Sequence, residues 1–275
     1  MLNVTERSSM KGLNLQFMRC GGQGNIYRSR ENGLIYKIGK KGSSEISAKI
    51  LIREGQFAAW FENYPGLVKV REIGQIKGQP FLAMEPVEGI NLEDLQKKYS
   101  NHKIPEKLAV AILLKTAKML YSNLHAQKHY HGDLKPSNVM ANLVPSGKKV
   151  RIEITLIDLG SVAPFSKPTV FFTPSYASPE QTRVEPLDQR SDIYSLGAMF
   201  LKMLTGVNPF LAAKKEETIL NVQAKKVPAK LLKGLSLDLS MIVLKMLEKD
   251  PAERYQDCGE LISDLNRIMK SYQTS

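Results

Sequence analysis

The sequence contains little cysteine, no long apolar run and few acidic residues. Two cysteines occur in 275 residues, Cys20 and Cys258, and their wide separation does not match the spacing of a disulfide framework or a metal site. The apolar run from Leu108 to Leu114 ends at Lys115, far short of the roughly 20 residues that span a bilayer. The opening residues, MLNVTERSSMKG, hold no apolar core of a signal peptide. We therefore expect a cytoplasmic protein without a membrane span.

Basic residues outnumber acidic ones, 39 to 27, which gives a formal net charge of +12. A hydrophobic content of 43% with 24% charged residues is typical of a folded globular protein and argues against global disorder. The lysine doublets are scattered, and they are not interleaved with the aromatic residues that a groove for single-stranded nucleic acid requires. Solvated surfaces are the favoured interpretation. Contact with nucleic acid or another polyanion through the basic surface stays an open alternative.

The first third of the chain has the texture of short strands. The pattern predicts strands over 13–20, 26–30 and 34–38, and Asn32-Gly33 between the last two is a strong hairpin signal. Residues 44–61 carry apolar side chains at helical spacing behind Ser44, a plausible N-cap. Two further strands are predicted over 68–76 and 80–85.

The pattern becomes helical after Gly89, with long helices predicted over 105–125 and 192–204. Strands first and helices later predict the α+β class, with a small β-rich N-lobe (12–87) that has one main helix and a larger, mostly helical C-lobe (88–270). The hinge is expected at 85–89, and the two lobes would form one domain. A cleft between lobes is where ligands commonly bind.

Residues 130–140, YHGDLKPSNVM, place an acid, a base and an amide at fixed spacing in Asp133, Lys135 and Asn138. Further along, LIDLG is an apolar strand that ends in Asp158-Leu-Gly. The later motifs, in order, are TPSYASPE (173–180), DIYSLG (192–197), LTGVNPF (204–210) and DPAER (250–254). Together these motifs resemble a eukaryotic-type (Hanks-like) Ser/Thr protein kinase over about residues 15–265. The resemblance is to a bacterial-like variant with His-Gly-Asp in the catalytic loop.

This resemblance implies a bilobal kinase fold and an enzyme that uses ATP with Mg²⁺ or Mn²⁺ to phosphorylate Ser/Thr hydroxyls of protein substrates. Asp133 would orient the substrate hydroxyl and accept its proton, and Lys135 would lie against the γ-phosphate. Asn138 and Asp158 would supply oxygen ligands to the metal. Thr173 would hydrogen-bond Asp133 and Lys135.

Four further residues are expected to act structurally. Glu180 would form a buried pair with Arg254, and Asp192 would anchor the backbone of the catalytic loop from inside a helix. His131 is expected to brace the same loop rather than act as a base.

The nucleotide-binding half departs from the family pattern. Gly21, Gly22 and Gly24 match the glycine-rich loop, whose backbone N–H groups must approach phosphate oxygens closely. Arg19 stands at the position of the first glycine. The segment LIYK ends in Lys37, which matches the phosphate-binding lysine.

Two choices around that lysine stay open. Lys41 is a rival to Lys37, and Glu45 is the runner-up to Glu54 as the helix partner of the lysine. Ile35 replaces the small residue that normally covers the adenine ring, which places nucleotide affinity in question.

The resemblance also implies an adenine pocket. Ile26, Ile35 and Met140 would sandwich the ring, and Met84 would guard the back of the pocket. The carbonyl of Glu85 and the N–H of Val87 would read the edge of the base.

Two other functions compete with a protein kinase. One is a small-molecule phosphotransferase of the aminoglycoside-kinase type, which often carries His-Gly-Asp. The other is a pseudokinase scaffold, although Lys37, Asp133 and Asp158 are all present. Gly132 replaces the arginine that holds a phosphate on the activation loop in phosphorylation-switched relatives, so Thr169 lacks that partner. We therefore predict activity without obligatory phosphorylation of the loop.

Overall fold

The computed structural model describes residues 3–7, 13–21, 24–40, 45–147 and 149–274. The chain divides into two compact units. The N-terminal unit comprises residues 1–88 and 155–161, and the C-terminal unit comprises residues 89–154 and 162–275. The lobe ranges expected from the sequence, 12–87 and 88–270, remain predictions. Each unit is described by itself.

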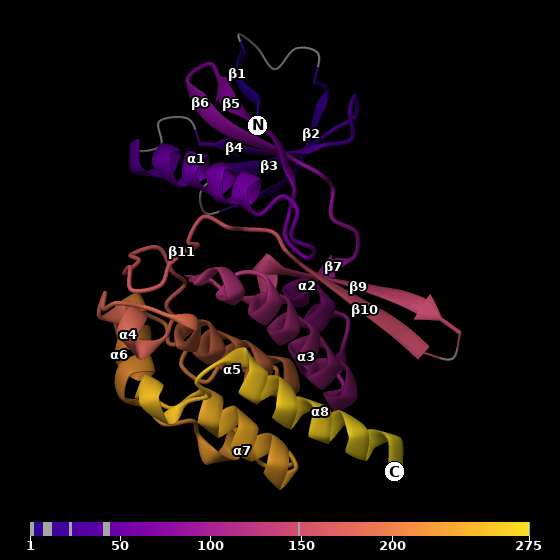
Figure 1. The fold of residues 1–275 in the computed structure, drawn as a ribbon, viewed down its shortest axis with the longest axis vertical. Helices are drawn as coiled ribbons and strands as arrows, with labels where there is room; N and C mark the ends of the chain where they lie inside the picture. The colour runs from indigo at the N-terminus through magenta and orange to yellow at the C-terminus, as the bar shows by residue number, and fades with distance from the viewer. Residues whose placement is uncertain (1–2, 8–12, 22–23, 41–44, 148, 275) are drawn as a thin grey trace. The chain divides into compact units, whose positions relative to one another are not determined.

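The N-terminal unit is built on a six-stranded sheet with the order β1-β5-β6-β4-β3-β2 (Figure 1). Its strands are β1 (Asn3–Arg7), β2 (Leu15–Cys20), β3 (Gly24–Ser29), β4 (Ile35–Gly39), β5 (Val70–Ile76) and β6 (Gln79–Met84). Neighbouring strands pair antiparallel except β1, which runs parallel to β5. The sequence predicts five of these strands to within two residues at each end, and β1 is the addition.

Helix α1 (Glu45–Trp60) packs on one face of this sheet. A Cβ atom at Gly55 would lie 2.4 Å from a side-chain carbon of Ile73 and 2.7 Å from one of Leu82, so a glycine is needed for this close approach. The opposite face carries a buried apolar cluster: Leu13, Tyr36, Ile38, Ile76, Phe81 and Ala83. Both faces of the sheet are therefore covered, and Lys37 on β4 points to the face that α1 covers because it alternates with Tyr36 and Ile38.

The C-terminal unit is mostly helical (Figure 1). Its helices are α2 (Leu92–Lys97), α3 (Glu106–Ser122), α4 (Pro179–Thr182), α5 (Gln189–Thr205), α6 (Lys215–Ala224), α7 (Leu237–Met246) and α8 (Cys258–Thr274). Its short strands are β7 (Ile90–Asn91), β8 (His129–Tyr130), β9 (Val139–Ser146), β10 (Lys149–Leu156, which ends in the N-terminal unit) and β11 (Ala163–Pro164). Helix α5 is buried along almost its whole length and packs against α3 and α7, while α8 packs against the same two helices.

The predicted helix boundaries shift by a few residues. Helix α3 ends at Ser122, because Asn123 leaves the helical conformation, and a separate 3₁₀ turn follows at His125–Gln127. Helix α5 begins at Gln189, where the side chain of Asp188 caps it by accepting from the N–H of Arg190. The predicted α+β class is confirmed. Among the described residues, no helix has the length and apolarity needed to cross a bilayer.

A buried ion pair fixes helix α4 within the C-terminal unit. Arg254 Nη1 and Nη2 donate to the two carboxylate oxygens of Glu180 at 2.7 and 2.8 Å, and Ser191 Oγ donates to Glu180 at 2.7 Å. The remaining guanidinium donors bond the backbone carbonyls of residues 190, 248 and 249. Burial opposes ionisation of Glu180, but the hydrogen bonds from Arg254 and Ser191 outweigh it and lower its pKa. The pair is thus fully satisfied.

We expect Arg254→Met to lower the free energy of unfolding by about 3–5 kcal/mol, because it leaves the Glu180 carboxylate buried and unpaired. Arg183→Met is the matched control. It breaks the exposed ion pair between Arg183 and Glu185, two residues apart in the sequence, and should cost less than about 1 kcal/mol. Urea unfolding measures both. The loss in Arg254→Met should shrink as the pH falls, because a protonated Glu180 no longer needs a cation. Equal losses in the two variants would contradict this account.

Candidate active site

One buried carboxylate holds the loop that follows β8. Asp192, 1% exposed in the first turn of α5, accepts from the backbone N–H of His131 at 2.8 Å and from that of Gly132 at 3.0 Å. His125 Nε2 lies 2.9 Å from the same carboxylate. Gly132 has a φ of +78°, in the left-handed region that costs a non-glycine residue roughly 1–2 kcal/mol. A glycine here therefore holds the turn without backbone strain.

Asp133 follows this turn, and both of its carboxylate oxygens are engaged. Oδ2 lies 2.6 Å from Lys135 Nζ, and Oδ1 accepts from the backbone N–H of Thr173 at 2.8 Å. Lys135 Nζ also donates to Thr173 Oγ1 at 2.8 Å. The sequence predicts contacts among these three residues, and the structure adds that Asp133 receives the amide rather than the hydroxyl of Thr173.

Asn138 closes the loop at the end of a 3₁₀ turn (Pro136–Asn138). Its Nδ2 donates to the backbone carbonyl of Asp133 at 3.0 Å, and the residue is 6% exposed. Because the amide nitrogen is engaged inside the loop, the amide oxygen is the end that could bind a cation.

The N-terminal unit contains a second charged cluster. Lys37 on β4 lies 2.6 Å from Glu54 on α1 and 3.5 Å from Asp158, measured from Nζ to the carboxylate oxygens. Burial disfavours the charge of Lys37, but the carboxylates of Asp158 and Glu54 outweigh it and raise the pKa of the ammonium. Burial of Glu54, which is 0% exposed, raises the pKa of its carboxyl to about 7 even though Lys37 opposes the shift. The charge on Lys37 favours the ionised form of Glu54 against this burial.

Three candidate positions lie outside the part of the chain that the structure describes. Lys41 lies outside the described residues, and so does the side chain of Glu45. Gly22 also lies outside them.

Close backbone contacts require the two described glycines of the loop. Gly21 N–H donates to the carbonyl of Gly24 at 2.8 Å. A Cβ at Gly21 would lie 2.8 Å from that same oxygen, and one at Gly24 would lie 2.5 Å from the carbonyl oxygen of Ile38. The turn at Gly21 and the close contact between β3 and β4 at Gly24 therefore each require a glycine, whether or not a phosphate binds there.

The predicted adenine residues of the N-terminal unit share one face of the sheet. Ile35 pairs with Met84, and Ile26 pairs with Lys37, two residues along β4 from Ile35. Met84 is buried at 6% exposure, whereas Ile26 and Ile35 are half-buried. These apolar side chains therefore lie on the face that also carries the lysine.

The predicted hinge residues follow directly. The backbone N–H of Glu85 donates to the carbonyl of Lys69 at 2.9 Å, and its carboxylate accepts from Arg71 Nε at 2.8 Å. Val87 is half-buried. Met140 lies on β9 in the C-terminal unit and is half-buried there.

Each unit offers one oxygen donor of the kind that a hard divalent cation prefers. The donor of the N-terminal unit is the Asp158 carboxylate, and that of the C-terminal unit is the Asn138 amide oxygen. Among the described residues, no group of three His, Cys, Asp or Glu side chains could hold a metal ion. Mg²⁺ commonly takes one or two protein ligands and completes its shell with phosphate oxygens and water, so the residues present fit that mode.

The sequence did not indicate one contact with the loop that carries Asp133. Gln181 Nε2 donates to the backbone carbonyl of Gly132 at 2.5 Å, and Gln181 is 1% exposed. The signal was in the sequence, because Ser178-Pro-Glu-Gln181 has the Ser-x-x-Gln form of a capping box, which places the glutamine in the first turn of a helix. The capping-box pattern does not predict which loop the glutamine side chain contacts.

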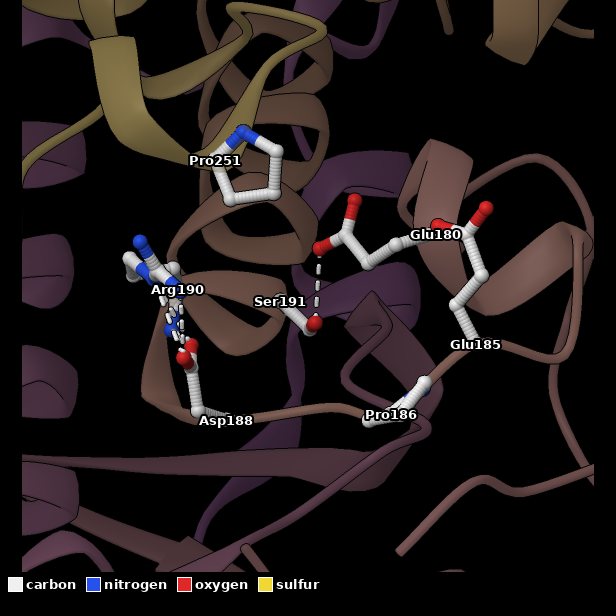
Figure 2. A pocket seen from close by; sticks show the side chains of 7 residues that line it. All are labelled: Glu180, Glu185, Pro186, Asp188, Arg190, Ser191 and Pro251. Carbon is white, nitrogen blue, oxygen red and sulfur yellow. Dashed lines mark hydrogen bonds and ion pairs between the residues drawn. The ribbon is translucent and has the colours of Figure 1, made fainter. Parts of the chain in front are cut away.

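A pocket of about 250 Å³ lies elsewhere in the C-terminal unit (Figure 2). In the figure, Glu180 and Ser191 meet on one side, and Asp188 and Arg190 meet on another. Its third carboxylate, Glu185, bonds Arg183 outside the lining. Its acidic side chains thus already have partners, and the pocket lies beside the buried pair of Glu180 and Arg254.

Residues 20–264 of the chain match the protein kinase domain. The chain belongs to the protein kinase domain family. Serine/threonine-protein kinase PknB of Mycobacterium leprae is 32% identical over 222 residues, covering 78% of this chain and 35% of that protein. A probable serine/threonine-protein kinase of Clostridium perfringens is 30% identical over 277 residues, covering 94% and 39%. Serine/threonine-protein kinase PknJ of Mycobacterium bovis is 28% identical over 261 residues, covering 89% and 43%. This kinase domain thus spans less than half the length of these relatives.

We expect Lys37→Met to destabilise the kinase domain by about 3–5 kcal/mol at pH 8, because the buried Glu54 must then either ionise without its cation or take up a proton that the unfolded chain does not bind at that pH. The loss should be smaller at pH 5.5, since a carboxyl with a raised pKa is protonated there and leaves no charge unpaired. Denaturant unfolding at the two pH values measures the difference.

The double variant Lys37→Met/Glu54→Gln is the control for this prediction. It should recover most of the stability at pH 8, because it removes the stranded charge. A loss that is the same at both pH values and is not recovered by the double variant would contradict the assignment of the pair.

Proposed function

We propose that this kinase domain transfers the γ-phosphoryl group of ATP to Ser and Thr hydroxyls of protein substrates. The observation that carries the proposal is the network around Asp133, which joins Lys135 to Thr173 through hydrogen bonds of 2.6 and 2.8 Å. Phosphoryl transfer needs little covalent chemistry from the protein; it needs an aligned hydroxyl and offset charge. An acid and a base held together beside a fixed loop supply both.

The proposed chemistry is a direct transfer. The substrate hydroxyl oxygen bonds to the γ-phosphorus, the bond from that phosphorus to the β–γ bridging oxygen breaks, and ADP leaves. Asp133 orients the hydroxyl and accepts its proton. Lys135 offsets the negative charge on the transferred group, and its hydrogen bond to Thr173 ties it to the activation segment.

The proposed nucleotide site uses the residues that the sequence indicated. Lys37 would hold the phosphates with Glu54 behind it, next to the glycine-rich turn at Gly21, Gly22 and Gly24. The adenine would contact the following residues: Ile26, Ile35, Met84, Glu85, Val87 and Met140. Mg²⁺ or Mn²⁺, when bound, would neutralise phosphate charge, with Asn138 and Asp158 as its protein ligands.

We further propose that the domain works without obligatory phosphorylation of its activation segment. Gly132 offers no cation to a phosphate, and Thr169 is buried at 5% exposure with its Oγ1 accepting from the N–H of Phe171. A kinase would have to unfold this turn to reach the hydroxyl. The buried hydroxyl therefore supports a segment that is ordered by its own hydrogen bonds.

The wider biology of the protein is also a proposal. A cytoplasmic location rests on the two free cysteines, Cys20 and Cys258. The competing functions, a pseudokinase scaffold and a small-molecule phosphotransferase, gain no specific observation. Contact with nucleic acid or another polyanion rests on net charge alone.

We expect Asp133→Asn to bind Mg·ADP nearly as well as the wild type and to transfer phosphate about 10²–10⁴-fold more slowly, because proton acceptance and orientation are lost. Calorimetry measures the first quantity, and label transfer from γ-labelled ATP to casein, myelin basic protein or kanamycin measures the second. Asp94→Asn, in an exposed pair on α2, is the control. Unchanged transfer by Asp133→Asn, or label on kanamycin alone, would refute the proposal.

Replacement of Thr169 by Ala should leave kcat within about two-fold of wild type, since Gly132 supplies no cation to a phosphate there. Steady-state kinetics with casein, together with a circular dichroism check of folding, makes the comparison. Loss of activity in a folded Thr169→Ala protein would show that the segment does depend on this residue.

A further inference from the structure

The amide of Gln181 is held at both of its ends. Its Oε1 accepts from the backbone N–H of Ser178 at 3.4 Å, while Ser178 Oγ accepts from the N–H of Gln181 at 3.3 Å. This capping box fixes which end of the amide is the oxygen. The NH₂ end therefore points to the carbonyl of Gly132, 2.5 Å away.

The peptide unit that Gln181 bonds is the one that carries Asp133. Its carbonyl, from Gly132, accepts from Gln181, and its N–H, from Asp133, donates to His131 Nδ1 at 3.2 Å. Both polar ends of one peptide plane are thus tethered to side chains. Because the plane is rigid, these two bonds limit rotation about the backbone bonds that aim the Asp133 side chain.

The position of Gln181 is itself fixed. It follows Glu180, which is locked to Arg254 by two hydrogen bonds of 2.7 and 2.8 Å. A continuous set of buried contacts therefore runs from Arg254 through helix α4 to Gly132. All of these contacts are made by side chains and backbone groups of the chain itself.

We infer that Gln181 is a positioning residue for the phosphoryl-transfer step, acting through the Gly132–Asp133 peptide. This inference rests on the proposed function. In this inference the neutral side chain of Gln181 couples the end of the activation segment to the catalytic loop. Loss of the Gln181 donor lets the peptide plane rotate, which misaims the Asp133 carboxylate while leaving the nucleotide-binding residues unaltered.

Three variants separate positioning from stability. Gln181→Met removes the donor and the capping acceptor. Gln181→Glu keeps an acceptor for Ser178 but donates to Gly132 only when its carboxyl is protonated. Gln96→Met is the matched control, because Gln96 is 2% exposed and its Nε2 bonds the carbonyls of His102 and Lys202 instead of the catalytic loop.

We expect kcat with casein to fall about 10- to 100-fold in Gln181→Met, with the KM for ATP unchanged, as for a small misplacement of a reacting group. Gln96→Met should keep the wild-type kcat. The kcat of Gln181→Glu, divided by the wild-type value at the same pH, should fall as the pH rises from 6 to 9, because deprotonation removes the donor. A kcat ratio that stays near one at every pH would overturn the inference, even if Gln181→Met does not fold.

Amide hydrogen exchange gives a readout that does not need activity. The N–H groups of Gly132 and Asp133 should exchange about ten-fold or more faster in Gln181→Glu at pH 8 than in wild type, and no faster in Gln96→Met. If wild type transfers no label to casein, the proposed function fails while exchange still decides whether Gln181 fixes the loop. Unchanged exchange at both amides would overturn the inference by itself.

Discussion

The buried carboxylate of Asp192 is the constraint on which the candidate site depends. It accepts two consecutive backbone N–H groups, from His131 and Gly132, and so sets the path of the chain just before Asp133. Burying a carboxylate costs free energy unless its oxygens accept hydrogen bonds. Asp192 Oδ2, which accepts from the N–H of His131, also lies 2.9 Å from His125 Nε2. Helix α5 can carry such a group because it is the central, almost wholly buried helix of its unit.

Around this anchor, hydrogen bonds within the chain fix the loop that carries Asp133. Gly132 adopts a left-handed conformation at no steric cost, and its carbonyl then faces the donor of Gln181. Asp133 is left between Lys135 and the amide of Thr173. These contacts support the proposal that the geometry of the loop does not depend on a later phosphorylation.

Much of this arrangement could be predicted, because the charged residues stand in motifs that resemble those of protein kinases. The resemblance to protein kinases favoured Lys37 and Glu54 as partners, with Lys41 and Glu45 as alternatives, and Lys37 Nζ lies 2.6 Å from Glu54 Oε2. Strand β1 was not foreseen: NVTER has no apolar alternation, and its parallel pairing with β5 is a long-range contact that local pattern cannot encode. The role of Gln181 was missed for a similar reason, since a capping box predicts a helix start but not the carbonyl that its side chain reaches.

The most direct test of a loop assembled without phosphate is the first turnover of phosphate-free protein. The chain would be treated with a phosphatase, shown by mass spectrometry to carry no phosphate, and mixed with Mg·ATP and casein. Phosphoserine and phosphothreonine in casein should then rise linearly from the first time point, with no dependence of specific activity on enzyme concentration. A lag that shortens as the enzyme concentration rises, or the absence of any label on casein, would contradict the account.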